Sequence, residues 1–348
     1  MCKRENTKPV YAGKVKIGGG GVSIQSMCNT DTIDVDKTAR QINQLAAEGC
    51  EIARLAVNNA DAAKAFAEIR KKTHIPLVAD IHFDYRLALL CVENGADKIR
   101  INPGNIGEKS NVLQVAKACK SRNIPIRIGV NMGSMEAEVV KRFGKTAQAM
   151  VESALYNVGL LNECDFDDIV ISLKASSVKV TVDAYRLISK RVGYPLHIGV
   201  TESGTLHSGM IKSSIGIGAL LLDGIGDTIR VSLTADPIEE VRAAKSILRA
   251  TGLLHSGAEL ISCPSCGRCK IDQIKIANEV EKALGKINKN VKVAVMGCVV
   301  NGPGEASDAD IGIAGGDGCA ILFKKGKIVR KIKECEIIDT LLKEIGDM

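Results

Sequence analysis

Short runs of β-branched residues alternate with longer amphipathic segments from residue 22 to about residue 250. The longer segments, such as 36–49 and 236–252, carry apolar residues at spacings of three and four. They begin with acidic residues or Asp-Pro and end at glycine, which is typical of helices. The pattern therefore predicts eight strands, each followed by a helix, with the strands at 22–27, 51–57, 76–82, 97–102, 125–131, 167–174, 196–201 and 227–232.

Eight strand-helix units favour one particular architecture. Strands separated by helices pair in parallel, and eight units fit a closed barrel better than an open doubly wound sheet, which is the alternative. We therefore expect an α/β fold that begins with a TIM-like (β/α)8 barrel. The glycine-rich stretch "IGGGGV" at 17–22 lacks the third glycine of a dinucleotide-binding fingerprint and precedes a strand, so we interpret it as a turn.

Cations interrupt strands that should be aliphatic. Parallel barrel strands are buried on both faces, and an unpaired buried charge costs several kcal/mol. One such residue is usually a rim residue paired with a carboxylate, but five on five of the eight strands are harder to explain in that way. They lie toward the carboxyl ends, where such barrels place active sites, and guanidinium groups bind phosphate oxygens bidentately. We therefore expect a phosphate or diphosphate ligand held by Arg54, Arg100, Arg127, Lys174 and Arg230.

Other polar residues follow the same strand ends and are candidates for orienting a ligand or transferring a proton. Glu202, in "GVTESGT", is the best candidate for a general acid because it lies among so many cations. It is equally well interpreted as a counter-ion to one of the arginines. The remaining candidates are Asp80, His82, Asn102, Asn131, Ser203 and Ser232.

The pattern changes near residue 255, which predicts a barrel domain over 1–255 and a smaller α+β domain over 256–348. The smaller domain is expected to contain a helix at about 270–284, short strands to about 332 and a last helix from about 336. A turn-rich loop with Asn-Gly and Pro-Gly follows the strand that ends at Cys298.

Three cysteines in "CPSCGRCK" have the spacing C-x2-C-x2-C. This is the first part of a ferredoxin signature without its C-x3-C-P continuation, and a zinc ribbon would need a second C-x2-C. We favour an iron-sulfur site over zinc, with Cys263 and Cys266 as two ligands. From spacing alone, the other ligands come from Cys269, Cys298, Cys319 and an oxygen donor.

Composition narrows the classes of partner. The net charge of +7 indicates an anionic partner, but no lysine-rich tail or aromatic-interleaved basic stretch indicates nucleic acid. The charged start "MCKRENTKPV" and the lack of an apolar run of about 20 residues predict a cytoplasmic protein outside the membrane. Twelve cysteines without a secretory signal favour reduced thiols over a disulfide framework.

Motifs along nearly the whole chain resemble one enzyme family, the 4-hydroxy-3-methylbut-2-en-1-yl diphosphate synthases of the non-mevalonate (MEP) isoprenoid pathway, in their short bacterial form. The motifs are "VADIHF", "IRINPGN", "RIGVN", "SLKAS", "GVTESG", "SCPSCGR" and "GCVVNGPGE". The resemblance implies a TIM-like barrel followed by a domain similar to those of sulfite and nitrite reductases. It also implies reductive ring opening and dehydration of 2-C-methyl-D-erythritol 2,4-cyclodiphosphate by two electrons.

The resemblance implies roles for individual residues. It implies one 4Fe-4S cluster per chain, held by Cys263, Cys266, Cys298 and Glu305, with Cys269 outside the ligand set. Glu202 matches the residue proposed as proton donor in the family. The substrate-binding positions implied are Arg54, Asp80, His82, Arg100, Arg127, Asn131, Lys174, Arg230, Ser232 and Asn301.

The family also implies partners: flavodoxin or ferredoxin as electron donor, and a homodimer in which one subunit's cluster domain completes the partner's active site. An alternative function is an iron-sulfur electron-transfer protein with a phosphate-binding barrel. Such a relay would be expected to use thiolate ligands only, whereas a carboxylate ligand exchanges more readily and frees an iron for substrate.

Overall fold

A computed structural model describes residues 2–102, 106–285, 287, 289–300, 304 and 306–348. The chain divides into two compact units, Met1–Leu253 and Leu254–Met348, and each is described by itself. This division falls two residues before the one expected from the sequence.

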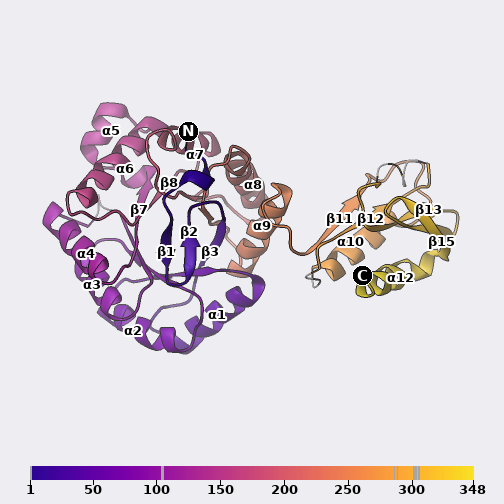
Figure 1. Ribbon diagram of the computed structural model, residues 1–348, viewed down its shortest axis with the longest axis horizontal. Helices are drawn as coiled ribbons and strands as arrows, with labels where there is room; N and C mark the ends of the chain where they lie inside the picture. The colour runs from indigo at the N-terminus through magenta and orange to yellow at the C-terminus, as the bar shows by residue number, and fades with distance from the viewer. Residues whose placement is uncertain (1, 103–105, 286, 288, 301–303, 305) are drawn as a thin grey trace. The chain divides into compact units, whose positions relative to one another are not determined.

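The first unit is an eight-stranded parallel barrel surrounded by helices, as predicted (Figure 1). Its strands are paired in the order β8-β7-β6-β5-β4-β3-β10-β9, and a parallel bridge between Ile171 and Leu196 closes the circle. The strands are β3 (Ser23–Met27), β4 (Ile52–Ala56), β5 (Leu77–Ile81), β6 (Lys98–Ile101), β7 (Ile126–Asn131), β8 (Ile169–Lys174), β9 (His197–Ile198) and β10 (Thr228–Ile229). All eight lie within the predicted runs.

A helix follows each barrel strand, and the helix ends are fixed by local chemistry. The Asp34 side chain accepts the Lys37 N–H at the start of α1, and Gly49 ends that helix in the left-handed conformation. Asp236 caps α9 in the same way, before Pro237. The surrounding helices are α1 (Val35–Glu48), α2 (Ala60–Lys71), α3 (Tyr85–Glu93), α4 (Lys109–Ser121), α5 (Ala137–Phe143), α6 (Ala147–Asn162), α7 (Val178–Ile188), α8 (Leu206–Leu222) and α9 (Pro237–Ala250).

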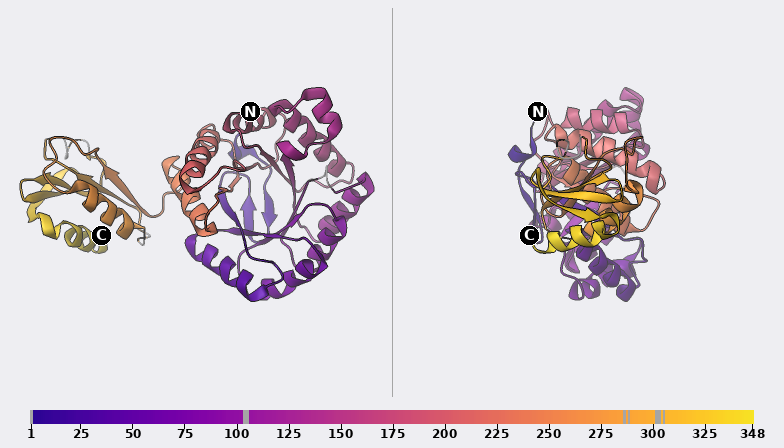
Figure 2. Two further views of the ribbon diagram at one scale, coloured as in Figure 1. Left: turned by 180° about the vertical axis from the view of Figure 1, so that it is seen from behind. Right: turned by 90° about the vertical axis from the view of Figure 1, so that its right-hand side faces the viewer.

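A hairpin that the sequence pattern did not predict covers the amino end of the barrel. It consists of β1 (Val10–Ala12) and β2 (Val15–Ile17), paired antiparallel (Figure 2). Fully buried hairpin residues pack against Ile52, Val78 and Val170 at the start of three barrel strands. The glycine-rich stretch after β2 is a bend that leads into β3, which confirms its interpretation as a turn.

The second unit is an α+β domain built on a mixed five-stranded sheet in the order β11-β12-β13-β14-β15. The first three strands are parallel and the last two pairings are antiparallel. Both helices pack on one face through a common apolar core. The elements are β11 (Ala258–Ser262), α10 (Gln273–Leu284), β12 (Val291–Met296), β13 (Ile311–Gly316), β14 (Cys319–Lys324), β15 (Lys327–Lys333) and α12 (Ile337–Gly346). Strand β11 was not predicted.

Candidate active site

The cations predicted on the strands lie inside the barrel. Arg127 interacts electrostatically with Arg54 on β4, Arg100 on β6 and Arg230, which follows β10. These strands are not all neighbours in the sheet, so their side chains can approach one another only across the barrel interior. Register agrees, because Arg100 pairs with Arg127 on β7 and with Asp80 on β5, which places all three on one face.

Asp80 is the carboxylate at the centre of this group. It is 1% exposed and accepts hydrogen bonds from Arg54 at 2.5 Å and from Arg100 at 3.0 Å. The His82 ring nitrogen Nε2 lies 3.0 Å from the same carboxylate. Burial would raise the pKa of Asp80, but the two guanidinium groups and His82 hold it well below its usual range. Asp80 is therefore ionised and fixes the positions of two arginines and a histidine.

The other cations form no ion pair with a carboxylate within the described residues, although the nearby Glu240 acts to raise the pKa of Arg230 and of Lys174. Arg127 is 1% exposed, and its Nε and Nη1 atoms have no hydrogen-bond acceptor among the described residues. The same holds, within that part of the chain, for Lys174 Nζ and Arg230 Nε. Burial and then the neighbouring cations lower the pKa of Lys174 well below its ordinary value, and burial lowers that of Arg230 to about 10. The lumen therefore presents unsatisfied donors that an anion with several oxygens would satisfy.

A glycine makes room for one of these cations. A Cβ atom at Gly199, on the strand end after β9, would lie 2.8 Å from Lys174 Nζ and 2.4 Å from the carbonyl oxygen of Arg230. The backbone oxygen cannot move aside as a flexible side chain can. The close approach of these strand ends therefore depends on glycine at this position.

The interior also holds polar residues that sequence reasoning missed. Lys98 is fully buried, and its Nζ atom donates to Gln25 Oε1 at 3.1 Å. Burial, Arg127 and Arg54 lower the pKa of Lys98 well below its ordinary value. His197 is also fully buried, and neither ring nitrogen has a partner among the described side chains and backbone. The missed signal is the two-residue spacing of Lys98 and Arg100, which puts both on the same strand face.

The remaining predicted barrel residues are placed as follows. Asn102 is buried and its Nδ2 atom donates to Ser134 Oγ at 2.7 Å. Glu202 is exposed and has a φ of 53°, in the left-handed region that non-glycine residues rarely occupy. Ser203 is buried and donates to the carbonyl oxygen of Val200, whereas Asn131 and Ser232 are half-buried.

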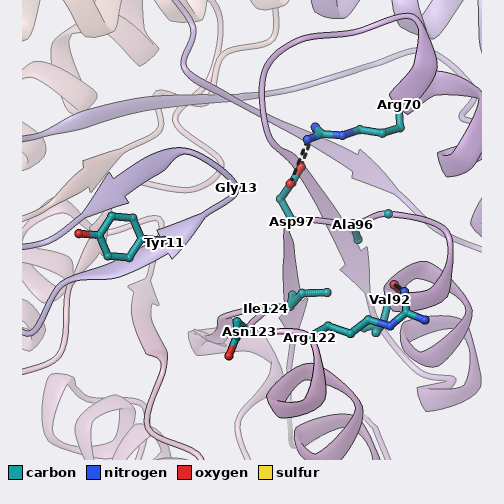
Figure 3. A pocket seen from close by; sticks show the side chains of 10 residues that line it. Tyr11, Gly13, Arg70, Val92, Ala96, Asp97, Arg122, Asn123 and Ile124 are labelled. Atoms are coloured by element: carbon teal, nitrogen blue, oxygen red, sulfur yellow. Dashed lines mark hydrogen bonds and ion pairs between the residues drawn. The ribbon is translucent and has the colours of Figure 1, made fainter.

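A cavity lies at the opposite end of the barrel unit from these strand ends (Figure 3). It has a volume of about 520 Å³ and is lined by hairpin residues and by the segments before β6 and β7. In this cavity Arg70 forms an ion pair with Asp97 at 2.8 Å, and Arg122 donates a hydrogen bond to the carbonyl oxygen of Val92. This end of such barrels usually serves stability, so we do not assign it to catalysis.

The predicted cysteine ligands lie on loops of the second unit. Cys263 Sγ accepts the Gly297 N–H at 3.4 Å and lies 3.3 Å from Gln273 Nε2. Cys266 is exposed, and the backbone N–H of Arg268 lowers the pKa of its thiol. Cys298 is half-buried directly beyond β12.

Cys269 has a different environment. Its thiol donates to the Ile271 carbonyl oxygen at 3.1 Å, and the side chain packs against the apolar core. Within the described residues no three histidine, cysteine, aspartate or glutamate side chains are gathered closely enough to hold a metal ion. Glu305 and Asn301 lie outside the described residues.

These features define an α/β-barrel protein with a cationic lumen, joined to an α+β domain that carries a cysteine motif. The chain belongs to the GcpE family: residues 7–245 match the GcpE TIM-barrel domain, and residues 259–347 match the GcpE protein C-terminal domain. Both the expected family and the expected fold class are confirmed.

Curated relatives match over the full length. A protein of Caldanaerobacter subterraneus is 60% identical over 99% of this chain and 98% of its own length. A protein of Clostridium acetobutylicum is 58% identical over 99% of this chain and 100% of its own length. Both are named 4-hydroxy-3-methylbut-2-en-1-yl diphosphate synthase (flavodoxin).

Solved structures show likeness in fold. A dihydropteroate synthase from Stenotrophomonas maltophilia is 13% identical, with a TM-score of 0.52 over 71% of this chain and 99% of its own. A dihydropteroate synthase from Yersinia pestis is 11% identical, with a TM-score of 0.51 over 71% of this chain and 100% of its own chain. At such identities the likeness extends to the barrel fold alone.

None of the described helices is both long and apolar enough to span a bilayer.

Proposed function

We propose that this protein catalyses the reductive ring opening and dehydration of 2-C-methyl-D-erythritol 2,4-cyclodiphosphate to 4-hydroxy-3-methylbut-2-enyl diphosphate. The carrying observation is the barrel lumen, where Asp80 pairs with Arg54 and Arg100. Several donors of the five lumen cations have no partner in the described part of the chain. A cyclic diphosphate supplies the anionic oxygens that these donors need. The names of the full-length relatives support the same reaction.

The lumen residues bind and orient the substrate. Arg127, Lys174 and Arg230 have donors without partners among the residues that the structure describes, and these donors bind the diphosphate directly. Asp80 holds Arg54 and Arg100 in place beside them. Asn131, Ser232 and His82 line the same strand ends, and we also assign Asn301 to substrate binding. Because four of the cations are carried by strands and Arg230 directly follows one, their positions are largely set before the ligand arrives, which lowers the ordering cost of binding.

Glu202 is the proposed proton donor to the leaving oxygen. It is exposed on the loop that follows β9, and its left-handed backbone is the type of local strain that concentrates at functional sites. Glutamine at this position keeps the shape but cannot supply the proton, so Glu202→Gln should lower kcat more than it raises KM. A change confined to KM would assign Glu202 to the counter-ion role.

Residues of the second unit fit an iron-sulfur group. Cys263 sulfur receives a backbone N–H, and a backbone N–H favours the thiolate of Cys266, as is suitable for metal ligands. We assign Cys263, Cys266, Cys298 and Glu305 as the ligands of one 4Fe-4S cluster per chain, with Cys269 outside the set. When bound, the cluster supplies electrons one at a time to the substrate.

We also propose the partners of the reaction. The names of the relatives support flavodoxin as electron donor, with ferredoxin as the other candidate. We propose a homodimer in which the cluster domain of one subunit completes the barrel site of the other. None of the twelve cysteines, all of which the structure describes, forms a disulfide, which supports a reducing compartment, the cytoplasm.

The test is anaerobic turnover of the cyclic diphosphate with a low-potential reductant, together with iron, sulfide and zinc analysis. We expect product formation by a protein that contains iron and sulfide. A colourless zinc protein would contradict the proposal.

Glu305→Cys separates the enzyme from an electron-transfer protein. An enzyme that needs an exchangeable carboxylate ligand should keep its cluster but lose turnover. Unchanged turnover with four thiolates would remove the reason for a carboxylate ligand.

A further inference from the structure

Gln273, the first residue of α10, is a buried amide beside the cysteine loop. It is 3% exposed, and its Nε2 atom lies 2.6 Å from the Cys263 carbonyl oxygen and 3.3 Å from Cys263 Sγ. The same nitrogen also lies near Ser262 Oγ and the Val295 carbonyl oxygen, at 3.1 and 3.4 Å. Four acceptors thus surround two N–H groups.

The orientation of this amide is fixed by its neighbours. Carbonyl oxygens accept but cannot donate, so the end of the amide that faces Cys263 and Val295 must be the NH₂ group. The opposite end, Oε1, lies 3.6 Å from Cys269 Sγ. The N–H therefore faces the sulfur of Cys263 and the oxygen faces Cys269.

The backbone leaves a space of matching size. A Cβ atom at Gly297 would lie 2.4 Å from Gln273 Oε1 and 2.8 Å from Cys269 Sγ. Glycine at this position admits the amide, and the Gly297 N–H itself donates to Cys263 Sγ at 3.4 Å. Cys263 sulfur therefore has one backbone and one side-chain donor.

We propose that Gln273 is a positioning residue for the redox centre: its amide N–H donates to Cys263 sulfur and thereby raises the reduction potential of the group that Cys263 holds. This inference rests on the proposed function, because it takes Cys263 as a cluster ligand. Reduction adds one electron, which increases the negative charge on the ligand sulfur, and an N–H donor stabilises that reduced state more than the oxidised one. Partners of this kind also fix a ligand's orientation.

The test compares the wild-type protein with Gln273→Leu and Gln273→Met, both of which remove the donor and keep a side chain of similar size. Each protein is reconstituted anaerobically, its iron and sulfide are counted, and its midpoint potential is measured by mediated titration followed by electron paramagnetic resonance. We expect both variants to keep the cluster and to shift to lower potential. The expected loss in the reduction equilibrium constant is three- to tenfold, and tenfold corresponds to about 59 mV for one electron.

Cys269→Ser is the matched control, because it changes the partner of Oε1 and leaves both N–H groups in place. Its reduction equilibrium constant should stay within about twofold of the wild-type value. An equal shift in this control would overturn the proposal, since the effect would then arise from packing.

Wild-type potentials in both Gln273 variants would also overturn it, as would loss of the cluster in both, which would make Gln273 a structural residue. A wild-type protein that binds no iron and sulfide would instead contradict the proposed function itself. The two failures are therefore distinguishable.

Discussion

The barrel lumen and the cysteine loop place their functional groups in opposite ways. Four of the lumen cations are carried by strands and Arg230 directly follows one. Arg127 is buried, and its Nε and Nη1 atoms lack partners in the described structure. The cysteine side chains lie on loops, where Cys266 is exposed and Cys263 and Cys298 are partly exposed. Buried unpaired charge costs stability, whereas an exposed thiol does not. The buried cations of the lumen therefore lower the stability of the fold while pre-organising a site for an anion. The exposed cysteine loop does not lower stability in this way.

The largest effect should come from Cys263→Ala. Removing this ligand should eliminate cluster binding and reduce turnover to background, while affinity for inorganic pyrophosphate changes by less than about twofold because the lumen is intact. Iron analysis, turnover and calorimetric titration measure the three quantities. Lost pyrophosphate affinity would show that the two regions are not separable in this way.

Arg127→Ala should produce the reverse result. Loss of one charge-assisted contact is worth about 2 kcal/mol, so pyrophosphate and substrate should bind roughly 30-fold more weakly, with cluster content unchanged. The matched control is Arg86→Ala, which removes an exposed guanidinium that pairs with Asp84. Calorimetry and iron analysis decide the outcome, and loss of iron in Arg127→Ala would indicate a structural role.

The smallest effect concerns pH and the cost of burial. Burial, Arg127 and Arg54 lower the pKa of Lys98 well below its ordinary value in the folded chain, so between that lowered pKa and about pH 10 the unfolded chain binds more protons than the folded one. Stability should therefore rise with pH, by about 1.4 kcal/mol per unit for each such group, and Lys174 acts in the same direction. Lys98→Met should remove the contribution of Lys98 to the slope of unfolding free energy against pH. Denaturant unfolding measured across this pH range gives that slope.

Lys117→Met, at an exposed position of α4, provides the comparison and should leave the slope unchanged. An unaltered slope in Lys98→Met would mean that Lys98 is charged in the folded barrel.

The sequence predicted the barrel because each strand run and helix segment carries its own local signals. It missed β11 and the β1–β2 hairpin, whose short strands have no long amphipathic partner segment. Arg100 was recognised as a lumen residue because it interrupts an aliphatic run. Lys98 was missed because it stands at the start of that run, where a lysine resembles an ordinary flanking residue.

The sequence also could not reveal how Asp80 and Gln273 act. The pairing of Asp80 with Arg54 and Arg100 depends on strand register. Gln273 contacts Cys263 because α10 starts beside the end of β11. In the sequence, nine residues separate Gln273 from Cys263. Contacts of this kind arise only from tertiary packing. The ligand set and the roles of Glu202, Glu305 and Asn301 stay predictions.

The hairpin at the amino end of the barrel has a consequence for ligand traffic. Its buried apolar residues, packed on Ile52, Val78 and Val170, leave the carboxyl ends of the strands as the entrance to the cationic lumen. Under the proposed function, substrate and product both carry a diphosphate and would bind the same cations, so the product would have to leave through the entrance before another substrate could bind. Product inhibition should accordingly be competitive, and inorganic pyrophosphate should slow the enzyme in the same manner.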